Sequence, residues 1–440
     1  MCLELPIYQR LDDEQKDVYD MDLMGRYLVE GPPGTGKSVV ALHRAAKFAK
    51  NNQEAVVLMY NRPLLLWTKE ALTKALSAAK CSPAQSKLIS TNTTEVWFKS
   101  WYSKTFEEAP PLVTNPKKPN KNIVTKYDGK CKVCDRATVK TVDRTVTFGG
   151  KWIAVHAQCL DALCMEMGYT GPDWGPTLIE HAGTRMSEAL KRCGQTLNLV
   201  IDEGQDLANN FYEVVSPFCQ SITVYADEAQ IVSDEKSLPI DIARILEIDT
   251  LNKKRLSTNY RNRAEVADLA AKFRPKRDAA AIAQKTKCSQ PPVIINFSSP
   301  DALEKHVRTL HSNFGQKSIG ILFKFNQGKE GREDFARRFS EDSWVSVYVD
   351  YMSKVDLCAP GALVANTQVS KGLEFDIVIL ADLQNWPSEP AGREDGQLYV
   401  LLSRSRDVLQ IAYVGEGEPP LLGNPRYRER LSGIELQKPR

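Results

Sequence analysis

The segment from Gly31 to Ser38, GPPGTGKS, constrains the fold and chemistry of this chain more than any other stretch. It matches the phosphate-binding loop pattern G-x-x-x-x-G-K-[ST] at every required position. Residues 26–30 predict a short strand before the loop, and apolar residues at helical spacing follow it. Because the loop stands between a strand and a helix, as the pattern requires, the segment predicts a site for a nucleoside triphosphate.

Each part of the loop has a predicted role. Its glycines allow backbone N–H groups to turn toward phosphates at the positive end of the following helix. We expect Lys37 to reach the β- and γ-phosphates and the hydroxyl of Ser38 to bind Mg²⁺. The predicted nucleotide-binding residues of the loop are Gly31, Pro32, Pro33, Gly34, Thr35, Gly36, Lys37 and Ser38.

A carboxylate for the metal is predicted far downstream. The apolar run 197–201 predicts a buried strand that ends at Asp202 and Glu203. A strand in this position would bring Asp202 to Mg²⁺, and Glu203 would orient the attacking water.

Composition excludes several classes of protein. The chain has 440 residues, 42% apolar and 26% charged, which is typical of a globular protein with two domains and an insert. It contains no apolar run of the roughly 18 residues that span a bilayer, and its start lacks the features of a signal peptide. We therefore expect a cytoplasmic protein without a membrane partner, in which the cysteines are thiols or metal ligands. A net charge of +3 is too small to indicate a partner, so a nucleic-acid surface would have to be a local groove.

The order of predicted elements favours an α/β fold. Strand-like runs alternate with helical segments, which is typical of parallel sheets; the clearest strands are 26–30, 55–60, 197–201, 222–224 and 293–295, and the clearest helices are 64–76 and 265–273. Between about Glu107 and Gly150, prolines and lysines cluster and the helical periodicity stops, which predicts an insertion. We expect the first lobe at 1–106 and 191–250, the insertion at 107–190, and a second lobe at 251–440.

The insertion contains a candidate zinc site. Cys131, Cys134, His156 and Cys159 form the pattern C-x₂-C-x₂₁-H-x₂-C, and two such pairs of soft ligands can close a tetrahedral structural zinc site. The β-rich runs 145–148 and 152–155 flank Gly149-Gly150, which predicts a hairpin and hence a small zinc-ribbon-like module. The alternative is a set of unrelated buried thiols, and Cys164 is a substitute ligand.

Further segments complete an ordered set of motifs. They are LDDEQ at 11–15, VYADEAQ at 224–230, NYRN at 259–262, SKGLEFD at 370–376 and LYVLLSRSR at 398–406. With the phosphate-binding loop and the acidic pair, they resemble the motif set of superfamily 1 helicases of the UvrD/Rep type. The resemblance implies two RecA-like lobes that bind ATP between them. The short stretch from Phe323 to Asn366 indicates a compact form that lacks the large accessory domain of the second lobe.

The resemblance assigns further roles. Gln15 would read the adenine edge, while Gly372 and Glu374 would line the nucleotide site, with Glu374 on the ribose. Gln230 would sense the γ-phosphate from the first lobe, and Arg261 and Arg404 would reach it from the second. The predicted catalytic residues are Lys37, Asp202, Glu203, Gln230, Arg261 and Arg404. ATP-driven closure of the lobes would then move single-stranded DNA, with 3′ to 5′ polarity implied by the resemblance alone.

Three segments are predicted to contact nucleic acid. Aromatic rings next to basic and polar groups suit base stacking and phosphate contacts; the predicted residues are Tyr60, Asn61, Arg62, Trp97, Trp101, Asn366, Thr367 and Gln368. For the two tryptophans, ordinary core packing is the alternative.

The sequence departs from the helicase pattern at two places. Residues 231–234, IVSD, replace the aromatic residues and the arginine that usually follow the Gln of the third motif, and Asn366 and Gln368 replace the usual Thr and His. These changes favour an alternative function, in which the chain is an ATP-gated regulatory or recruitment subunit of a DNA repair or anti-phage assembly without strong unwinding. The chain has no convincing nuclease signature, so cleavage would require a protein partner such as a nuclease.

Overall fold

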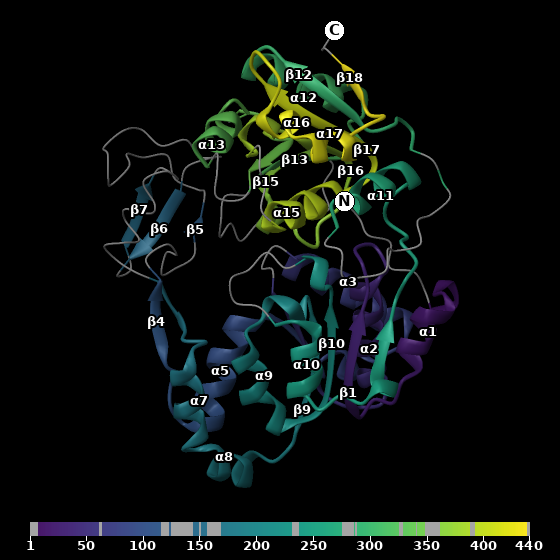
Figure 1. The fold of residues 1–440 in the computed structure, drawn as a ribbon. Helices are drawn as coiled ribbons and strands as arrows, with labels where there is room; N and C mark the ends of the chain where they lie inside the picture. The colour runs from purple at the N-terminus through teal and green to yellow at the C-terminus, as the bar shows by residue number, and fades with distance from the viewer. Residues whose placement is uncertain are drawn as a thin grey trace.

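The chain forms two α/β lobes, each built on a parallel sheet, with an arm on the side of the first lobe (Figure 1). The computed structural model describes residues 8–60, 64–115, 123–124, 144–148, 151–155, 169–230, 237–274, 286, 288–324, 329–339, 341–347, 361–387 and 392–437. The predicted fold class, α/β with two parallel-sheet lobes of the RecA-like kind, is confirmed. Within the described ranges, none of the helices has both the length and the apolar character needed to cross a bilayer.

The sheet of the first lobe has the strand order β11-β1-β10-β9-β2-β3. Its strands are β1 (Gly25–Glu30), β2 (Ala55–Met59), β3 (Ile89–Thr93), β9 (Leu197–Asp202), β10 (Cys219–Ala226) and β11 (Lys253–Arg255). The surrounding helices are α1 (Asp13–Asp20), α2 (Lys37–Lys50), α3 (Leu64–Ala78), α4 (Pro83–Ser86), α5 (Thr94–Phe106), α7 (Pro176–Gly183), α8 (Met186–Cys193), α9 (Asn209–Val215) and α10 (Pro239–Ile245). Short 3₁₀ turns η1 (Tyr8–Arg10), η3 (Gly204–Asp206), η4 (Ser216–Phe218), η5 (Glu228–Gln230) and η6 (Thr250–Asn252) complete the lobe.

The sheet of the second lobe has the order β14-β15-β13-β16-β17-β12-β18. Its strands are β12 (Val293–Phe297), β13 (Ser318–Phe323), β14 (Val345–Val347), β15 (Gly361–Asn366), β16 (Phe375–Leu380), β17 (Ser405–Val414) and β18 (Glu435–Gln437). Its helices are α11 (Ala264–Ala271), α12 (Pro300–Asn313), α13 (Lys329–Arg337), α14 (Thr367–Ser370), α15 (Gly392–Leu402), α16 (Pro420–Gly423) and α17 (Pro425–Arg430), with the turn η7 (Leu383–Asn385).

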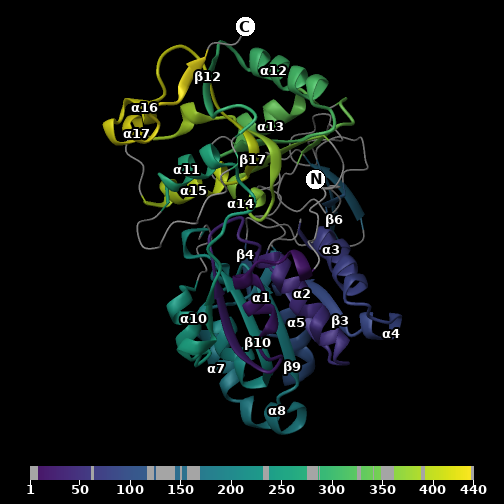
Figure 2. The same ribbon diagram turned by 90° about the vertical axis from the view of Figure 1, so that its right-hand side faces the viewer.

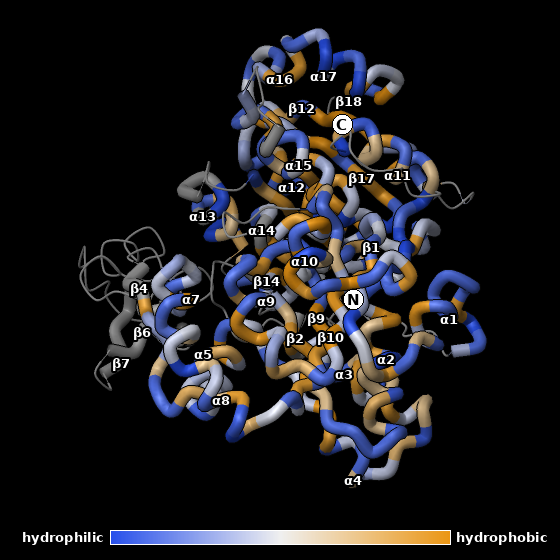
Figure 3. The backbone as a smooth tube through the Cα atoms, turned by 60° about the horizontal axis from the view of Figure 1, so that its bottom comes forward, coloured by the Kyte–Doolittle hydropathy of each residue, from blue (hydrophilic) through white to orange (hydrophobic). Residues whose placement is uncertain are grey.

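The sequence explains why these strands lie in the interior. Strands of a parallel sheet covered on both faces are apolar along their whole length, as in residues 199–201 of β9 and 377–380 of β16, all of which are fully buried. In Figure 3 the strands β2, β9 and β10 are mostly hydrophobic, whereas the helices alternate between hydrophobic and hydrophilic positions. The strands and helices predicted at 26–30, 55–60, 197–201, 222–224, 293–295, 64–76 and 265–273 are confirmed to within a few residues at their ends.

The boundary between the lobes differs from the predicted one. Strand β11 pairs in parallel with β1, with Leu28 opposite Lys253 and Glu30 opposite Arg255. The first lobe therefore continues through Arg255 rather than ending at residue 250. The sequence of β11, KKR, is that of a charged edge strand, and its lack of apolar residues is why the pattern did not indicate a strand.

The structure has a smaller insertion than the predicted range 107–190, and this insertion forms the arm. Strands β4 (Leu112–Asn115) and β8 (Tyr169–Pro172) pair antiparallel as its stem and enclose a small sheet of β5 (Ile123–Val124), β6 (Arg144–Phe148) and β7 (Lys151–Val155). Helix α7 and the start of α8 fall in the predicted range 107–190, but α7 packs on α9 and α8 packs on α5 of the first lobe. The insertion is thus limited to the segment that the stem encloses, and Figures 1 and 2 place its sheet beside the junction of the lobes.

The predicted hairpin within the arm is confirmed. Strands β6 and β7 pair antiparallel, with Phe148 opposite Lys151, as a hairpin requires. Gly149-Gly150, the predicted turn, lies outside the described residues. The four predicted zinc ligands, Cys131, Cys134, His156 and Cys159, and the substitute Cys164 lie outside the described residues. The zinc site therefore stays a prediction.

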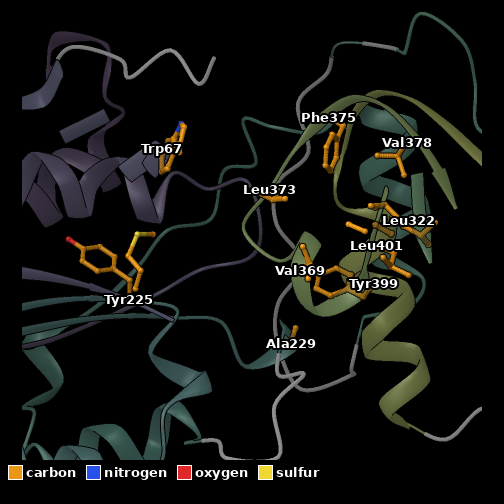
Figure 4. Close-up of a cluster of buried hydrophobic side chains, with 14 of the residues drawn as sticks. Trp67, Tyr225, Ala229, Leu322, Val369, Leu373, Phe375, Val378, Tyr399 and Leu401 are labelled. Atoms are coloured by element: carbon orange, nitrogen blue, oxygen red, sulfur yellow. The ribbon is translucent and has the colours of Figure 1, made fainter. Parts of the chain in front are cut away.

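The two lobes are packed against each other. One buried apolar cluster includes side chains of both, among them Ala229 on η5 and Val369, Leu373 and Tyr399 of the second lobe. Figure 4 shows Ala229 near Val369 and Tyr399, at the junction of the lobes. This shared apolar packing positions the residues of the two lobes that face each other at the junction.

Candidate functional site

The phosphate-binding loop runs from the end of β1 to the start of α2. Gly34 and Gly36 have left-handed backbone conformations, with φ of 79° and 84°, which favour glycine. A Cβ atom would lie 2.2 Å from Asn259 Oδ1 at Gly34 and 2.4 Å from Gln15 Nε2 at Gly36. The loop is therefore closely covered by two segments that the sequence also singled out, LDDEQ and NYRN.

Lys37 lies beneath the loop. Its buried ammonium group donates to the carbonyl oxygens of Gly31 and Pro32 at 2.5 and 3.0 Å. Burial lowers the pKa of Lys37, and the nearby carboxylates of Asp227, Glu203 and Asp202 act in the opposite direction. The cation thus stands among acidic groups at the carboxyl edge of the sheet.

Ser38 and Asp202, the two predicted ligands of Mg²⁺, contact each other. The Ser38 hydroxyl donates to Asp202 Oδ2 at 2.6 Å, which joins the start of α2 to the end of β9. Burial and the adjacent Glu203 raise the pKa of Asp202 to about 6. A hydroxyl and a carboxylate are the hard oxygen ligands that Mg²⁺ prefers, so these side chains fit that ion.

Glu203 is held by neighbours from both lobes. Its backbone has φ 55° and ψ 42°, a conformation that is strained for a non-glycine residue and common at functional sites. Its Oε2 accepts from Gln205 Nε2 at 2.6 Å and lies 3.9 Å from Lys371 Nζ of the second lobe. Burial alone would raise the pKa of Glu203, but Lys371 and Lys37 lower it below its usual value. The carboxylate is therefore ionised and oriented.

Arg404 spans the gap between the lobes. Its Nη2 donates to Gln230 Oε1 at 2.8 Å, and its other hydrogen bonds go to Ser403 Oγ and the carbonyls of Val400 and Leu373. Only 1% of the residue is exposed. The structure thus brings together two of the predicted catalytic residues, which come from different lobes.

Arg261 and Glu374 also meet. Arg261 Nε donates to Glu374 Oε2 at 2.6 Å, and Arg406 donates to the other carboxylate oxygen. Burial alone would raise the pKa of Glu374, but the two guanidinium groups lower it. In this structure the Glu374 carboxylate accepts hydrogen bonds from Arg261 and Arg406. Its contact with ribose stays a prediction. Gly372, close by, has φ 77°.

Gln15, which the resemblance assigns to the adenine, lies against the loop. Its Nε2 donates to the carbonyl of Thr35 at 3.0 Å, while its Oε1 and backbone N–H form a capping box with Asp12. The box fixes the start of α1, and the side chain is 5% exposed. The Tyr260 hydroxyl also donates to Asp12, the N-cap residue of α1.

The predicted nucleic-acid contacts are spread over both lobes. Trp97 and Trp101 stack on each other on α5, with ring centroids 5.3 Å apart, and pack on Phe211 and Phe218 of the first-lobe core. Tyr60 follows β2 and is partly buried against the same core. Asn61, Arg62 and the side chain of Gln368 lie outside the described residues.

Asn366 and Thr367 lie at the carboxyl end of β15 in the second lobe. The Asn366 side chain accepts from the N–H of Val369 at 2.9 Å and caps α14. Thr367 is fully buried. The Asn366 side chain therefore fixes the start of α14, and neither side chain is exposed on the surface.

The sequence reasoning did not single out several residues of the site. Gln205 and Asp206 lie in η3, shortly after β9, Asp227 follows β10 directly, and Lys371 precedes Gly372; all are at most 3% exposed. Their positions beside predicted residues, at the ends of buried strands or inside a motif, are the signal that could have found them.

Comparisons with known proteins support part of the predicted resemblance. Residues 25–121 match the family model for the DNA/RNA helicase domain of Schlafen group 3. This span holds the phosphate-binding loop, the strands β1 to β4 and the helices between them, so the first half of the first lobe is similar to that helicase domain. The comparison does not test the resemblance to the UvrD/Rep type, which stays a prediction.

A search among curated proteins gave no match. Among solved structures, the C-terminal domain of a possible DNA helicase from Lactobacillus plantarum WCFS1 is similar with a TM-score of 0.29 and 19% identity. The match covers 42% of this chain and 100% of that domain.

Proposed function

We propose that the chain is an ATP hydrolase that moves along single-stranded DNA, from 3′ to 5′, as its two lobes close and open on ATP. The observation that carries the proposal is the convergence of Lys37, Ser38, Asp202 and Glu203 of the first lobe with Arg404 of the second, since, against the effect of burial, both Lys37 and Arg404 lower the pKa of Glu203. These groups are the ones that phosphoryl transfer to water requires.

Each group has a defined task in the proposed reaction. Loop N–H groups and Lys37 bind the β- and γ-phosphates, and Gln15 binds the base. Ser38 and Asp202 would hold Mg²⁺, which would neutralise phosphate charge. Glu203 accepts a proton from the water whose oxygen attacks the γ-phosphorus, while the bond to the bridging oxygen breaks and ADP leaves.

Arg404 supplies positive charge from the second lobe. A planar guanidinium can contact two phosphate oxygens at once, and such arginines are worth about 10³- to 10⁵-fold in turnover. Because Arg404 already contacts Gln230 across the junction, its position depends on how the lobes are placed. Binding and loss of the γ-phosphate would therefore bias lobe closure.

A nucleic acid is the proposed partner. The similarity of residues 25–121 to a DNA/RNA helicase domain supports this class of partner. Among the described residues, Tyr60 at the end of β2 is the proposed contact. Asn366 and Thr367 at the end of β15 are 4% and 0% exposed, so their side chains offer no surface to a strand in this structure. The arm would carry a structural zinc ion on Cys131, Cys134, His156 and Cys159, and its hairpin β6–β7 has the form of a ribbon.

Hydrolysis in the presence and absence of single-stranded DNA tests the proposal. We expect ATP turnover to rise on adding single-stranded DNA and to fall about 10³-fold in Arg404→Ala. Arg428→Ala is the matched control, because Arg428 pairs with Glu418 on the surface with its side chain 63% exposed. If ATP turnover is equal in Arg404→Ala and in the wild type, Arg404 has no catalytic role.

A second candidate function is a regulatory or recruitment subunit that switches a protein partner. The sequence IVSD at 231–234, which lacks stacking residues, favours it. A strand-displacement assay separates the two functions: single-stranded DNA that stimulates hydrolysis without any displacement would support the second.

A further inference from the structure

Asn262 joins the linker between the lobes to the chain segment that carries Arg404. The linker, residues 256–263, connects β11 to α11. Asn262 is buried, with 1% of the residue exposed. Its Nδ2 donates to the carbonyl of Ser403 at 2.9 Å and to the carbonyl of Ser405 at 2.5 Å. One side-chain amide therefore holds the main chain on both sides of Arg404.

The orientation of this amide is fixed by its partners. Carbonyl oxygens can only accept, so the NH₂ group of Asn262 must face Ser403 and Ser405. The amide oxygen of Asn262 accepts from Asn259 Nδ2 at 2.9 Å. The oxygen of Asn259 in turn accepts from the N–H groups of Arg261 and Asn262 at 2.9 and 3.1 Å. Both ends of the Asn262 amide thus have partners, and a buried polar network that is satisfied in this way is rigid.

Other main-chain groups beside Arg404 are held as well. The carbonyl of Arg404 accepts from the N–H of Phe375 at 2.9 Å, and that of Arg406 accepts from the N–H of Arg263 at 3.0 Å. Together with the two bonds from Asn262, they give four consecutive carbonyls a donor from another segment. Because two of these four bonds come from one side chain, removal of the Asn262 amide releases half of them.

The pair Asn259–Asn262 also reaches the phosphate-binding loop. A Cβ atom at Gly34 would lie 2.2 Å from Asn259 Oδ1, and the N–H of Tyr260 donates to the Gly34 carbonyl at 2.8 Å. The pair therefore extends from this loop to the segment that carries Arg404. Two side-chain amides thus help to set the distance between the loop and the arginine.

We propose that Asn262 is a positioning residue that holds the main chain of Arg404 in the place from which its guanidinium group reaches the γ-phosphate of ATP. The inference rests on the proposed function, since it concerns the same hydrolysis. Asn262 contacts the chain that carries the arginine and acts through it. An arginine in this role is worth about 10³- to 10⁵-fold in turnover, and a displacement of about 1 Å can cost about 10²-fold.

The turnover and the ATP affinity of Asn262→Ala test the proposal. We expect kcat to fall about 10- to 100-fold, while Kd for a non-hydrolysable ATP analogue changes by no more than about threefold. Asn198→Ala is the matched control, because Asn198 is 6% exposed and its amide donates to the Glu54 carbonyl at 2.8 Å, at the amino end of β9. A wild-type kcat in Asn262→Ala, or a loss that appears in Kd instead, would overturn the proposal.

A second background distinguishes positioning of the arginine from a general loss of structure. In Arg404→Ala, the further substitution Asn262→Ala should lower the residual turnover by no more than about twofold, because the group that Asn262 positions is already absent. The residual rate is measured with the protein in excess over ATP. A loss in this background as large as in the wild type would show that Asn262 acts elsewhere.

An isosteric variant tests the hydrogen-bond donor without opening a cavity. Asn262→Asp keeps the size of the side chain but presents a carboxylate, which can only accept, to the carbonyls of Ser403 and Ser405. We expect its kcat to be at least as low as that of Asn262→Ala. Equal kcat values in Asn262→Asp and the wild type would overturn the proposal.

The wild type and Arg404→Ala separate failure of the inference from failure of the proposed function. A wild-type protein without ATP turnover would overturn both, and full turnover in Arg404→Ala would overturn the role of Arg404 and the inference with it. Loss of turnover in Arg404→Ala, together with a wild-type kcat in Asn262→Ala, would overturn the role of Asn262 alone.

Discussion

The hydroxyl of Ser38 donates to the carboxylate of Asp202 at 2.6 Å, although 164 positions separate the two residues in the sequence. The chain between them forms strands β2 and β3, several helices and the whole arm before it returns in β9. Because β9 lies next to β10, and β10 next to β1, the parallel sheet brings the ends of β1 and β9 to one edge. The candidate nucleotide site thus depends on completion of the sheet and not on the length of the insertion.

Replacement of Glu203 by Gln should stop hydrolysis but keep ATP binding. The amide cannot accept the proton of the attacking water, and loss of a general base costs about 10²- to 10⁴-fold. Turnover and nucleotide affinity measured in parallel check this. Glu213→Gln on the exposed side of α9 is the control, and near-normal turnover in Glu203→Gln would exclude Glu203 from the catalytic role.

Replacement of Gln15 by Ala should reduce the preference for ATP over GTP by about tenfold, the worth of one or two hydrogen bonds to the base. KM values for both nucleotides measure the effect. Gln85→Ala is the matched control, because Gln85 forms the equivalent capping box at the start of α4, away from the loop. If KM rises equally for ATP and GTP in Gln15→Ala, the side chain supports the loop and does not read the base.

Asp382 should make the fold less stable as the pH rises. It follows β16, is fully buried, and accepts from the backbone N–H of Lys324 at 3.0 Å. Burial raises its pKa to about 7. The folded carboxyl therefore keeps its proton at a pH where the unfolded one, with a pKa of about 4, has lost it. Stability falls between these two values and is level above about pH 7.

Urea unfolding at pH 5 and pH 8 measures this effect. Asp382→Asn cannot ionise, so it should lose less stability than the wild type over that interval, by on the order of 2 kcal/mol. Asp301→Asn, at a side chain that is 80% exposed, is the control. If Asp382→Asn and the wild type lose the same free energy of unfolding between pH 5 and pH 8, the raised pKa of Asp382 is contradicted.

The arm should bind one zinc ion per chain. A sheet as small as β5-β6-β7 buries too little apolar surface to fold alone, so metal binding should supply its folding energy. The double substitution of Cys131 and Cys134 by Ser should remove the zinc and disorder the arm, while ATP binding by the lobes persists. Elemental analysis of protein purified without chelators tests the site, and a result without zinc would refute it.

Most of the candidate nucleotide site could be proposed from the sequence because its signals are local. The loop at 31–38 is a contiguous pattern, and Asp202 and Glu203 directly follow an apolar strand. Contacts between the lobes could not be predicted in the same way. The partner of Lys371 is Asp206 only because two separately folded sheets pack in one relative position, and no pattern within either segment encodes that position.

The sequence also does not distinguish a buried aromatic side chain from one that stacks on a ligand, because both environments favour the same residue types. Helix α5 has aromatic residues on adjacent faces, so the sequence alone did not decide whether Trp97 and Trp101 face the core or a ligand. In the structure their rings join the aromatic cluster around Phe98 and Phe211. Strand β11 was not predicted because its charged sequence, KKR, resembles that of a loop.

That short strand also has a protective effect. Strand β1, which leads into the phosphate-binding loop, has β10 on one side and β11 on the other, and Leu256 N–H extends the pairing to the carbonyl of Glu30 at 2.8 Å. A fragment cut at residue 250 would leave this side of β1 with unpaired backbone groups, which invite pairing with another chain. The connection to the second lobe thus shields the central nucleotide-binding strand against self-association, and its lysines and arginine keep the new outer edge charged.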